Sequence, residues 1–126
     1  SEWQTNVPPM NLARRHLACT VATLANGESG ILVSGGMAGL SLSTSEFYSK
    51  SVGDWIVLAD MTTGRYDHGL VAFEDGGIYA FGGIGKDSVE KYDATTNEWT
   101  EYEARLEIPR YRFGYVKTSE CLAKNE

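Results

Sequence analysis

The chain has 126 residues, with 11 Lys and Arg against 17 Asp and Glu, which gives a net charge of −6. This length suits one ordinary domain, and the negative charge argues against a nucleic-acid-binding surface, which needs a basic stripe. No run of about 18 apolar residues predicts a membrane span, and no basic stretch followed by an apolar segment marks a signal peptide.

The first half of the chain predicts four short strands joined by turns. Apolar runs of strand length cover residues 16–24, 31–36, 45–49 and 54–58. The connections between them are rich in Gly, Asn and Ser, and those at residues 25–30 and 37–44 are the longest. We therefore expect a four-stranded antiparallel meander.

The second half predicts the same arrangement, with strands at residues 68–73, 78–83, 88–93 and 97–102. Residues 88–93 alternate, with Val89 and Lys91 on one face and Glu90 and Tyr92 on the other, which is typical of a strand. Turn-forming residues separate the four runs. We expect almost no helix anywhere in the chain.

The two halves are copies of one unit. Each contains a glycine pair, then a tyrosine, then six residues, then a tryptophan; these are Gly35, Gly36, Tyr48 and Trp55 in the first copy and Gly82, Gly83, Tyr92 and Trp99 in the second. An internal repeat of this length indicates stacked supersecondary units. Four-stranded units stacked radially form a β-propeller, in which glycines permit close backbone approach and large aromatic residues fill the wedge between sheets.

Partial copies lie at both ends. Trp3 is typical of the last strand of a preceding unit, and residues 110–116 match residues 65–71, with Arg110 under Arg65. The predicted boundaries are an outer strand of a preceding blade at 1–10, blades at 12–58 and 64–103, an inner closing strand at 109–118, and a tail at 119–126.

The motif of a glycine pair, a tyrosine and a tryptophan at this spacing resembles the kelch repeat, and the resemblance runs from Trp3 to about Lys117. It implies an all-β, kelch-type β-propeller arc of about two full blades with part-blades at each end. The WD40 repeat fits less well, because the chain has Asp54-Trp55 where that family has Trp-Asp. A two-blade arc would leave apolar sheet faces and unpaired edges in water. We therefore expect the remaining blades to come from the same polypeptide or from other chains, with this chain as the C-terminal part.

No catalytic constellation is visible. His16 and His68 are interpreted as structural residues at equivalent places before the inner strands. Residues 82–88 lack the first glycine and the hydroxyl residue of a phosphate-binding P-loop. Two histidines and the distant Cys19 and Cys121 form no metal-ligand cluster, and we expect no catalytic residue, cofactor or metal. The lack of a disulfide framework and of a glycosylation sequon favours a reducing, intracellular compartment, with an extracellular one left open.

The resemblance also implies where a partner would bind. Kelch propellers like this one often bind acidic peptides at the channel mouth through arginines before the inner strand and polar loops after the glycine pairs. On this basis Arg15 and Arg112 are aligned with Asp67, and an arginine there can grip a carboxylate through two hydrogen bonds. The loop candidates are Met37, Ser41 and Ser43 in the first unit and Lys86 and Asp87 in the second.

The sequence thus predicts a non-catalytic protein-interaction module, with the substrate-recognition part of a ubiquitin-ligase adaptor as one specific form. Two alternatives stay open. One is a secreted or structural kelch protein that assembles with other chains, and the other is a kelch-type oxidase whose active groups lie in other blades. The partner we expect is a protein or peptide, with an acidic peptide as the specific form, and neither nucleic acid nor membrane.

Overall fold

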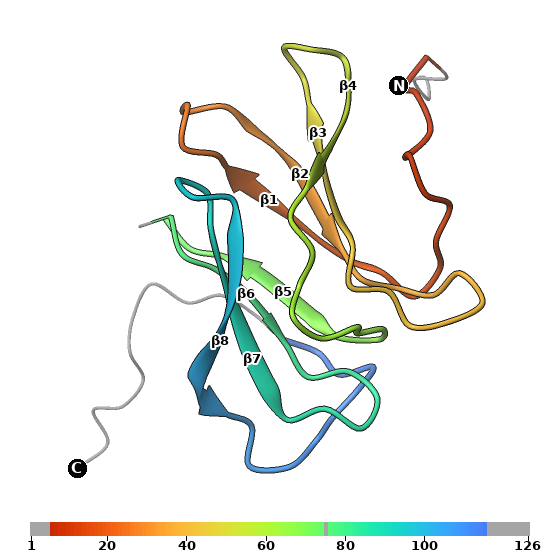
Figure 1. Ribbon diagram of the computed structural model, residues 1–126, viewed down its shortest axis with the longest axis vertical. Helices are drawn as coiled ribbons and strands as arrows, with labels where there is room; N and C mark the ends of the chain where they lie inside the picture. Colours follow the sequence, from red (N-terminus) through yellow and green to blue (C-terminus); the bar gives the residue numbers. More distant parts are fainter. Residues whose placement is uncertain (1–5, 75, 116–126) are drawn as a thin grey trace.

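Eight strands form two four-stranded sheets in the computed structural model, which describes residues 6–74 and 76–115 (Figure 1). The first sheet contains β1 (Ala18–Thr23), β2 (Ser29–Ser34), β3 (Ser45–Ser49) and β4 (Asp54–Leu58). The second contains β5 (Gly69–Ala72), β6 (Ile78–Phe81), β7 (Ser88–Asp93) and β8 (Glu98–Arg105). Each sheet is ordered as its strands follow in the chain, and every neighbouring pair is antiparallel.

The predicted all-β fold and the two meanders are confirmed. No helix occurs among the described residues. The predicted bounds of β3, β4 and β7 agree with the structure, whereas β2 and β6 end before their glycine pairs. The reason is that both glycines of each pair have positive φ, between 60° and 104°, which takes the backbone out of the extended region.

The last strand is longer than the sequence predicts. β8 continues to Arg105, which pairs with Ser88 across a register shift between Ser88 and Val89. Such a β-bulge adds residues to one strand and increases its twist. The alternation of apolar residues stops before this end of β8, so the extension leaves no trace in the hydrophobic pattern.

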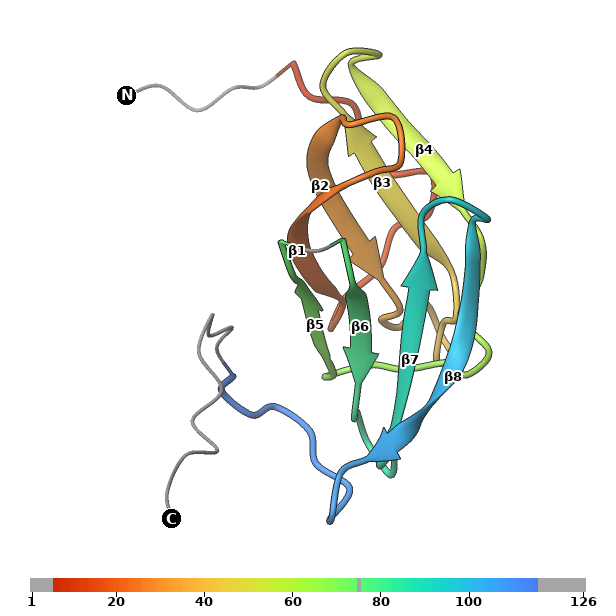
Figure 2. The same cartoon turned by 90° about the vertical axis from the view of Figure 1, so that its left-hand side faces the viewer.

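The two sheets pack face to face around one core, with the inner strands β1 and β5 side by side (Figure 2). The core draws on both sheets and on their connection; its largest members are Leu32, Phe47, Met61, Leu70, Ile78, Tyr92 and Trp99. Tyr92 and Trp99 form a cross-strand pair with ring centroids 5.1 Å apart, and Tyr48 and Trp55 repeat it at 5.5 Å. The turn between the third and fourth strands has the same length in both sheets, so the tyrosine lies opposite the tryptophan in each. This explains why six residues separate the two aromatic residues in both copies.

The predicted outer strand at 1–10 and closing strand at 109–118 are not strands where the structure describes them. Residues 6–10 and 109–115 have no ladder partner, and the remaining positions lie outside the described residues. A strand forms only by pairing with a neighbour, and these segments have no such neighbour among the described strands. Their assignment stays a prediction.

Candidate functional site

One end of the two sheets gathers the predicted binding residues. We call it the glycine-pair end. It comprises the segments that enter the inner strands, residues 14–17 and 64–68, the loops that follow the glycine pairs, residues 35–44 and 82–87, and residues 110–113, which pass beside the second loop. The glycine pairs bring these segments together, since Gly36 N donates to Arg65 O at 2.7 Å and Gly83 N donates to Arg110 O at 2.9 Å.

His16, Asp67 and Arg112 form a ladder across the successive units. The backbone N–H of Asp67 donates to the carbonyl of His16, and that of Arg112 donates to the carbonyl of Asp67, both at 3.0 Å. All three residues have φ near +50°, in the left-handed region that non-glycine residues seldom occupy. Strained residues that repeat at one place mark a functional or structural constraint.

The ladder corrects the alignment of the first unit by one residue. His16, and not Arg15, is equivalent to Asp67 and Arg112, and Leu17, not His16, is equivalent to His68. The sequence alignment matched residue letters, whereas the true register is set by the positive φ and by the inter-unit hydrogen bonds. Arg15 instead pairs through its backbone with Met37.

The side chains of the ladder are also joined. His16 Nδ1 lies 2.9 Å from Asp67 Oδ1, and Arg112 Nε donates to Asp67 Oδ2 at 2.9 Å. Burial by itself raises the pKa of Asp67, but the hydrogen bonds and charges of His16 and Arg112 outweigh it, so the pKa lies below its ordinary value. Asp67 therefore stays ionised, and its side chain is 8% exposed while that of Arg112 is 63% exposed.

Besides Arg110, three cationic side chains at this end have nitrogens without a partner among the described residues. The side chain of Arg15 is exposed and has no polar partner among the described residues, and Arg112 uses only Nε. Lys86 Nζ likewise has no partner within the described part of the chain, and its own N–H closes a turn onto Gly83. In a chain of net charge −6, this end therefore offers positive charge where the loops meet.

The loop candidates separate into two groups. Ser41 and Lys86 line one pocket of about 380 Å³ together with Gly64, Arg65, Tyr66 and Ile84, and Met37 connects Arg15 to Ser41 through isolated bridges. Ser43 and Asp87 do not join them. The carbonyl of Ser43 accepts from Met61 N at 2.8 Å, and Asp87 forms an ion pair with Arg105 at 2.9 Å on the outer strand.

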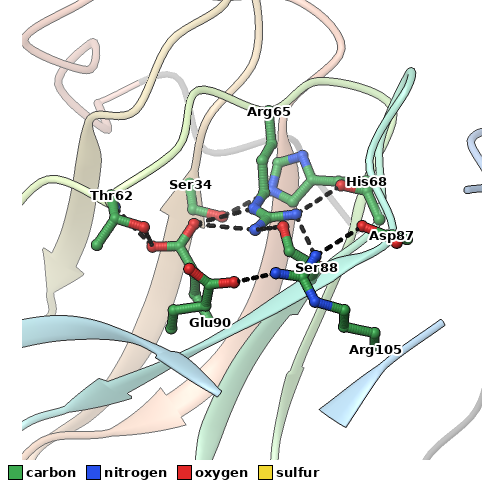
Figure 3. Close-up of polar contacts among 10 residues, drawn as sticks. Ser34, Thr62, Arg65, His68, Asp87, Ser88, Glu90 and Arg105 are labelled. Carbon is green, nitrogen blue, oxygen red and sulfur yellow. Dashed lines mark hydrogen bonds and ion pairs between the residues drawn. The ribbon is translucent and has the colours of Figure 1, made fainter. Parts of the chain in front are cut away.

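A buried polar framework, which the sequence reasoning missed, holds these loops (Figure 3). Arg65 donates to the carbonyls of Gly82 and Ser88 at 2.9 Å and to Glu90 Oε2 at 3.0 Å, and both ionic side chains are 0% exposed. Arg14 makes the same set of contacts in the first sheet, to Gly35, Thr44 and Glu46. The signal that could have found this framework is the recurrence of arginine at positions 14, 65 and 110.

His68 belongs to the framework and not to the binding surface. Its side chain is buried, and Nε2 lies 2.9 Å from Ser34 Oγ (Figure 3). Burial, followed by the charge of Arg65, lowers its pKa to about 4. A neutral, enclosed imidazole cannot exchange protons with a substrate at neutral pH, and its equivalents Leu17 and Phe113 are apolar.

The described part of the chain has neither a metal-ligand cluster nor a helix that could span a membrane. Residues 6–74 and 76–115 contain no group of three or more His, Cys, Asp and Glu that could hold a metal ion. Cys19 is exposed and free, and Cys121 lies outside the described residues. In the same two ranges no helix is long and apolar enough to cross a membrane.

Comparison with known proteins identifies the repeat. Residues 64–103, which contain β5, β6 and β7 and most of β8, match the kelch motif. Curated relatives include N-acetylneuraminate epimerases of Escherichia coli (strain K12) and Shigella sonnei (strain Ss046), and N-acetylneuraminate epimerase 2 of E. coli O6:H1. Each is 41% identical over 56 residues, which cover 37% of this chain and 15% of the relative.

The chain therefore spans only a small part of the curated relatives that it matches. The match to the kelch motif agrees with the resemblance noted in the sequence, and the first sheet repeats the second strand for strand. Kelch repeats are typically protein-interaction modules. Residues 64–103 thus carry a kelch motif, and the two four-stranded antiparallel sheets agree with blades of a partial kelch propeller.

Proposed function

We propose that the glycine-pair end is the face with which a kelch propeller containing this chain binds an acidic peptide of a protein partner. The single observation that carries the proposal is the group of unpaired cations, Arg15, Lys86 and the outer nitrogens of Arg112, at the place where the loops of both blades meet. A guanidinium grips a carboxylate through two charge-assisted hydrogen bonds, which gives both affinity and direction.

The ladder supports this proposal because it holds one of the cations, Arg112, in place in advance. Asp67 binds Arg112 through Nε alone, so the two outer nitrogens of the guanidinium keep their donors for a ligand. A side chain that is already oriented loses less conformational entropy on binding than a free one. Loops and strand ends carried on rigid sheets suit recognition for the same reason.

The proposal is tested with the propeller that contains this chain and an array of immobilised peptides of random sequence. We expect the retained peptides to be enriched in Asp and Glu. Replacing Arg15 and Arg112 by Ala should weaken binding of the retained peptides by about 2- to 30-fold together, since each solvent-exposed ion pair contributes roughly 0.2–1 kcal/mol. Arg105→Ala, which removes an arginine of the outer strand, is the matched control.

The ubiquitin-ligase adaptor is the finer form of this proposal. In that form the acidic peptide belongs to a protein that is passed on for ubiquitin transfer. Co-purification of the intact protein with ubiquitin-ligase activity supports it, and its failure removes the finer form while leaving the binding face in place.

A second candidate follows from the relatives, whose printed names make them epimerases of N-acetylneuraminate. N-acetylneuraminate carries a carboxylate, which the same cations can bind. Titration of the propeller with N-acetylneuraminate separates the two candidates. Binding that is lost in the Arg15 and Arg112 variants, together with epimerisation of the sugar, favours an enzyme, whereas binding of acidic peptides alone favours an interaction module.

A further inference from the structure

His16 is the member of the ladder whose side-chain type changes charge near neutral pH. Its Nδ1 lies 2.9 Å from Asp67 Oδ1, and its side chain is 36% exposed. His68, the other histidine of the chain, is buried. Histidine ordinarily gains or loses its charge between pH 5 and 8. A group that can titrate therefore lies on the same surface as the permanent cations Arg15 and Arg112.

Asp67 decides which nitrogen of the His16 ring carries the proton. The pKa of Asp67 lies below its ordinary value, so the carboxylate is ionised at neutral pH and can only accept hydrogen bonds. Nδ1 of His16 must therefore donate in the contact of 2.9 Å, while Arg112 Nε occupies the other carboxylate oxygen. In the neutral imidazole the remaining nitrogen, Nε2, then carries a lone pair and acts as an acceptor.

Nε2 of His16 has no polar partner within residues 6–74 and 76–115. Two groups of the second blade face the ring: Asp67 on Nδ1, and Tyr66, whose ring meets the imidazole edge-on with centroids 6.4 Å apart. Arg15 precedes His16 in the chain, and Arg112 reaches it only through Asp67. Protonation of His16 would thus place an unused N–H donor at the glycine-pair end.

We propose that His16 is a further recognition residue of the glycine-pair end, which binds a carboxylate of the acidic peptide through Nε2 in its protonated form. The neutral imidazole presents only a lone pair, which repels a carboxylate, whereas the imidazolium presents a charge-assisted N–H donor. Where His16 is neutral, binding therefore takes up a proton from the solvent. This inference rests on the proposed function, because it adds one residue and a dependence on pH to the same binding face.

The equivalent position in the third unit supports this role. Arg112 has φ of 48° against 55° for His16, and each lies 2.9 Å from one oxygen of the same Asp67 carboxylate. Each also keeps nitrogens without a partner among the described residues, the outer two of Arg112 and Nε2 of His16. His16 is therefore the titratable counterpart of a permanent cation, and arginine is a residue that this backbone position already accommodates.

The test is titration calorimetry of a retained acidic peptide with the natural protein that contains this chain, from pH 8 to 5.5. The peptide carboxylates stay ionised in this range, and His68 titrates below it, at about pH 4. We expect the affinity to rise about 2- to 5-fold towards pH 5.5, as for one exposed ion pair. Buffers of different ionisation enthalpy should report an uptake of about 0.2–0.4 proton per peptide at its maximum, which this change in affinity requires.

Three variants separate the titration of His16 from its structural contacts. His16→Asn suits the left-handed backbone and keeps an amide donor for Asp67 but has no Nε2, so it should abolish this proton uptake. His16→Arg copies Arg112 and should bind at pH 8 at least as tightly as the natural protein does at pH 5.5, without the dependence on pH. His68→Leu, which removes the buried histidine, is the control and should leave the proton uptake unchanged.

Nitrogen-15 NMR of the imidazole in the natural protein gives a readout that needs no peptide. We expect the proton of neutral His16 on Nδ1 at pH 8. Acetate, as the simplest carboxylate, should move the titration of His16 to higher pH than the same concentration of chloride does, because binding and protonation are linked. His16→Asn assigns the signal by its disappearance.

Each of three results would overturn the proposal: a neutral His16 with its proton on Nε2, the same proton uptake in His16→Asn as in the natural protein, or binding to His16→Arg that still depends on pH. If the array retains no acidic peptide, the proposed function fails by itself. The acetate titration then decides the inference about His16, and a titration that acetate and chloride leave at the same pH overturns it.

Discussion

The loops of the glycine-pair end are held by buried ion pairs between an arginine and a glutamate. Arg65 and Glu90 are both 0% exposed, so removing one leaves the other charged and unpaired. We predict that Arg65→Ala lowers the free energy of unfolding of the chain by about 3–5 kcal/mol. Arg105→Ala is the control: its side chain is 53% exposed, and the loss should stay below about 1 kcal/mol.

Urea denaturation of the unmodified protein and of the Arg65→Ala and Arg105→Ala variants checks this prediction. Equal midpoints for Arg65→Ala and Arg105→Ala would contradict the reading of Arg65 as a structural residue. A loss of ligand binding with unchanged stability would place Arg65 in the binding surface instead.

His68 makes stability depend on pH. Its pKa of about 4 in the folded protein lies below its ordinary value of 6.5, so the folded state binds fewer protons than the unfolded state between these values. The contribution of the neutral histidine is fully present above pH 6.5 and is lost as pH falls towards 4, and it amounts to about 3 kcal/mol in full. Asp67, with a lowered pKa, loses its own contribution only at still more acid pH.

The measurement is the free energy of unfolding from pH 7.5 to 4.5 for the natural sequence and for His68→Leu. Leucine is already found at the equivalent position, Leu17, and should flatten the dependence on pH across this range. A slope that persists unchanged in His68→Leu would show that another group is responsible.

At this scale the sequence predicts residue types better than residue roles. The sequence places Arg15, Arg112 and Asp67 at one recurring position, but the ion-paired ladder around Asp67 depends on φ values and inter-blade hydrogen bonds, which no letter pattern encodes. The sequence also favours Arg15 over Arg14, because the burial of a side chain cannot be read from two adjacent arginines.

At the scale of elements, the glycine pairs decide how close two blades lie. A Cβ on Gly35 would meet Arg65 O at 2.3 Å and His68 Cε1 at 2.7 Å, and the residue has φ of +60°. Gly39 in the same loop has φ of +83° but no atom within 4 Å of such a Cβ. Both glycines therefore have a left-handed backbone, but only Gly35 lies close to the next blade.

We predict that Gly39→Ala lowers stability by about 1–2 kcal/mol, the strain of a left-handed residue, and that Gly35→Ala lowers it by roughly 2–4 kcal/mol more, because the backbone of the next blade must move. Thermal and chemical unfolding of both variants check this. Equal losses would mean that the glycine is required for its φ alone and not for the approach of the blades.

The strands themselves were predictable because the alternation within each strand agrees with the aromatic pairs that join neighbouring strands. Alternation sets the faces of β7, and the aromatic pairs fix the turn between the third and fourth strands. The largest error lies where a boundary depends on the partner strand, at the bulge of β8. The outer strand at 1–10 and the closing strand at 109–118 stay predictions.

At the scale of the whole molecule, both outer faces of the arc expose apolar side chains. Val21 and Val57 on the first blade are 71% and 62% exposed, and Phe73 and Tyr102 on the second are 39% and 45% exposed. The equivalents of Val21, Phe73 and Tyr102 at the junction of the two blades are buried in the common core; they are Ala72, Ala22 and Leu58. A closed ring buries these faces, whereas an isolated arc leaves them in water.

We therefore predict that the isolated chain self-associates as its concentration rises, and that Val57→Lys reduces this association without unfolding the blade. Sedimentation velocity over a concentration series checks it, with Val52→Lys, an exposed valine in a turn, as the control. A chain that stays monomeric at every concentration would show that the open faces are compatible with water.

The most direct test of the account is a structure of the protein as its natural source makes it. We predict a closed propeller of at least about four blades, with the two blades described here as neighbours. A natural protein of this chain alone, monomeric and with both outer sheet faces in solvent, would contradict the account.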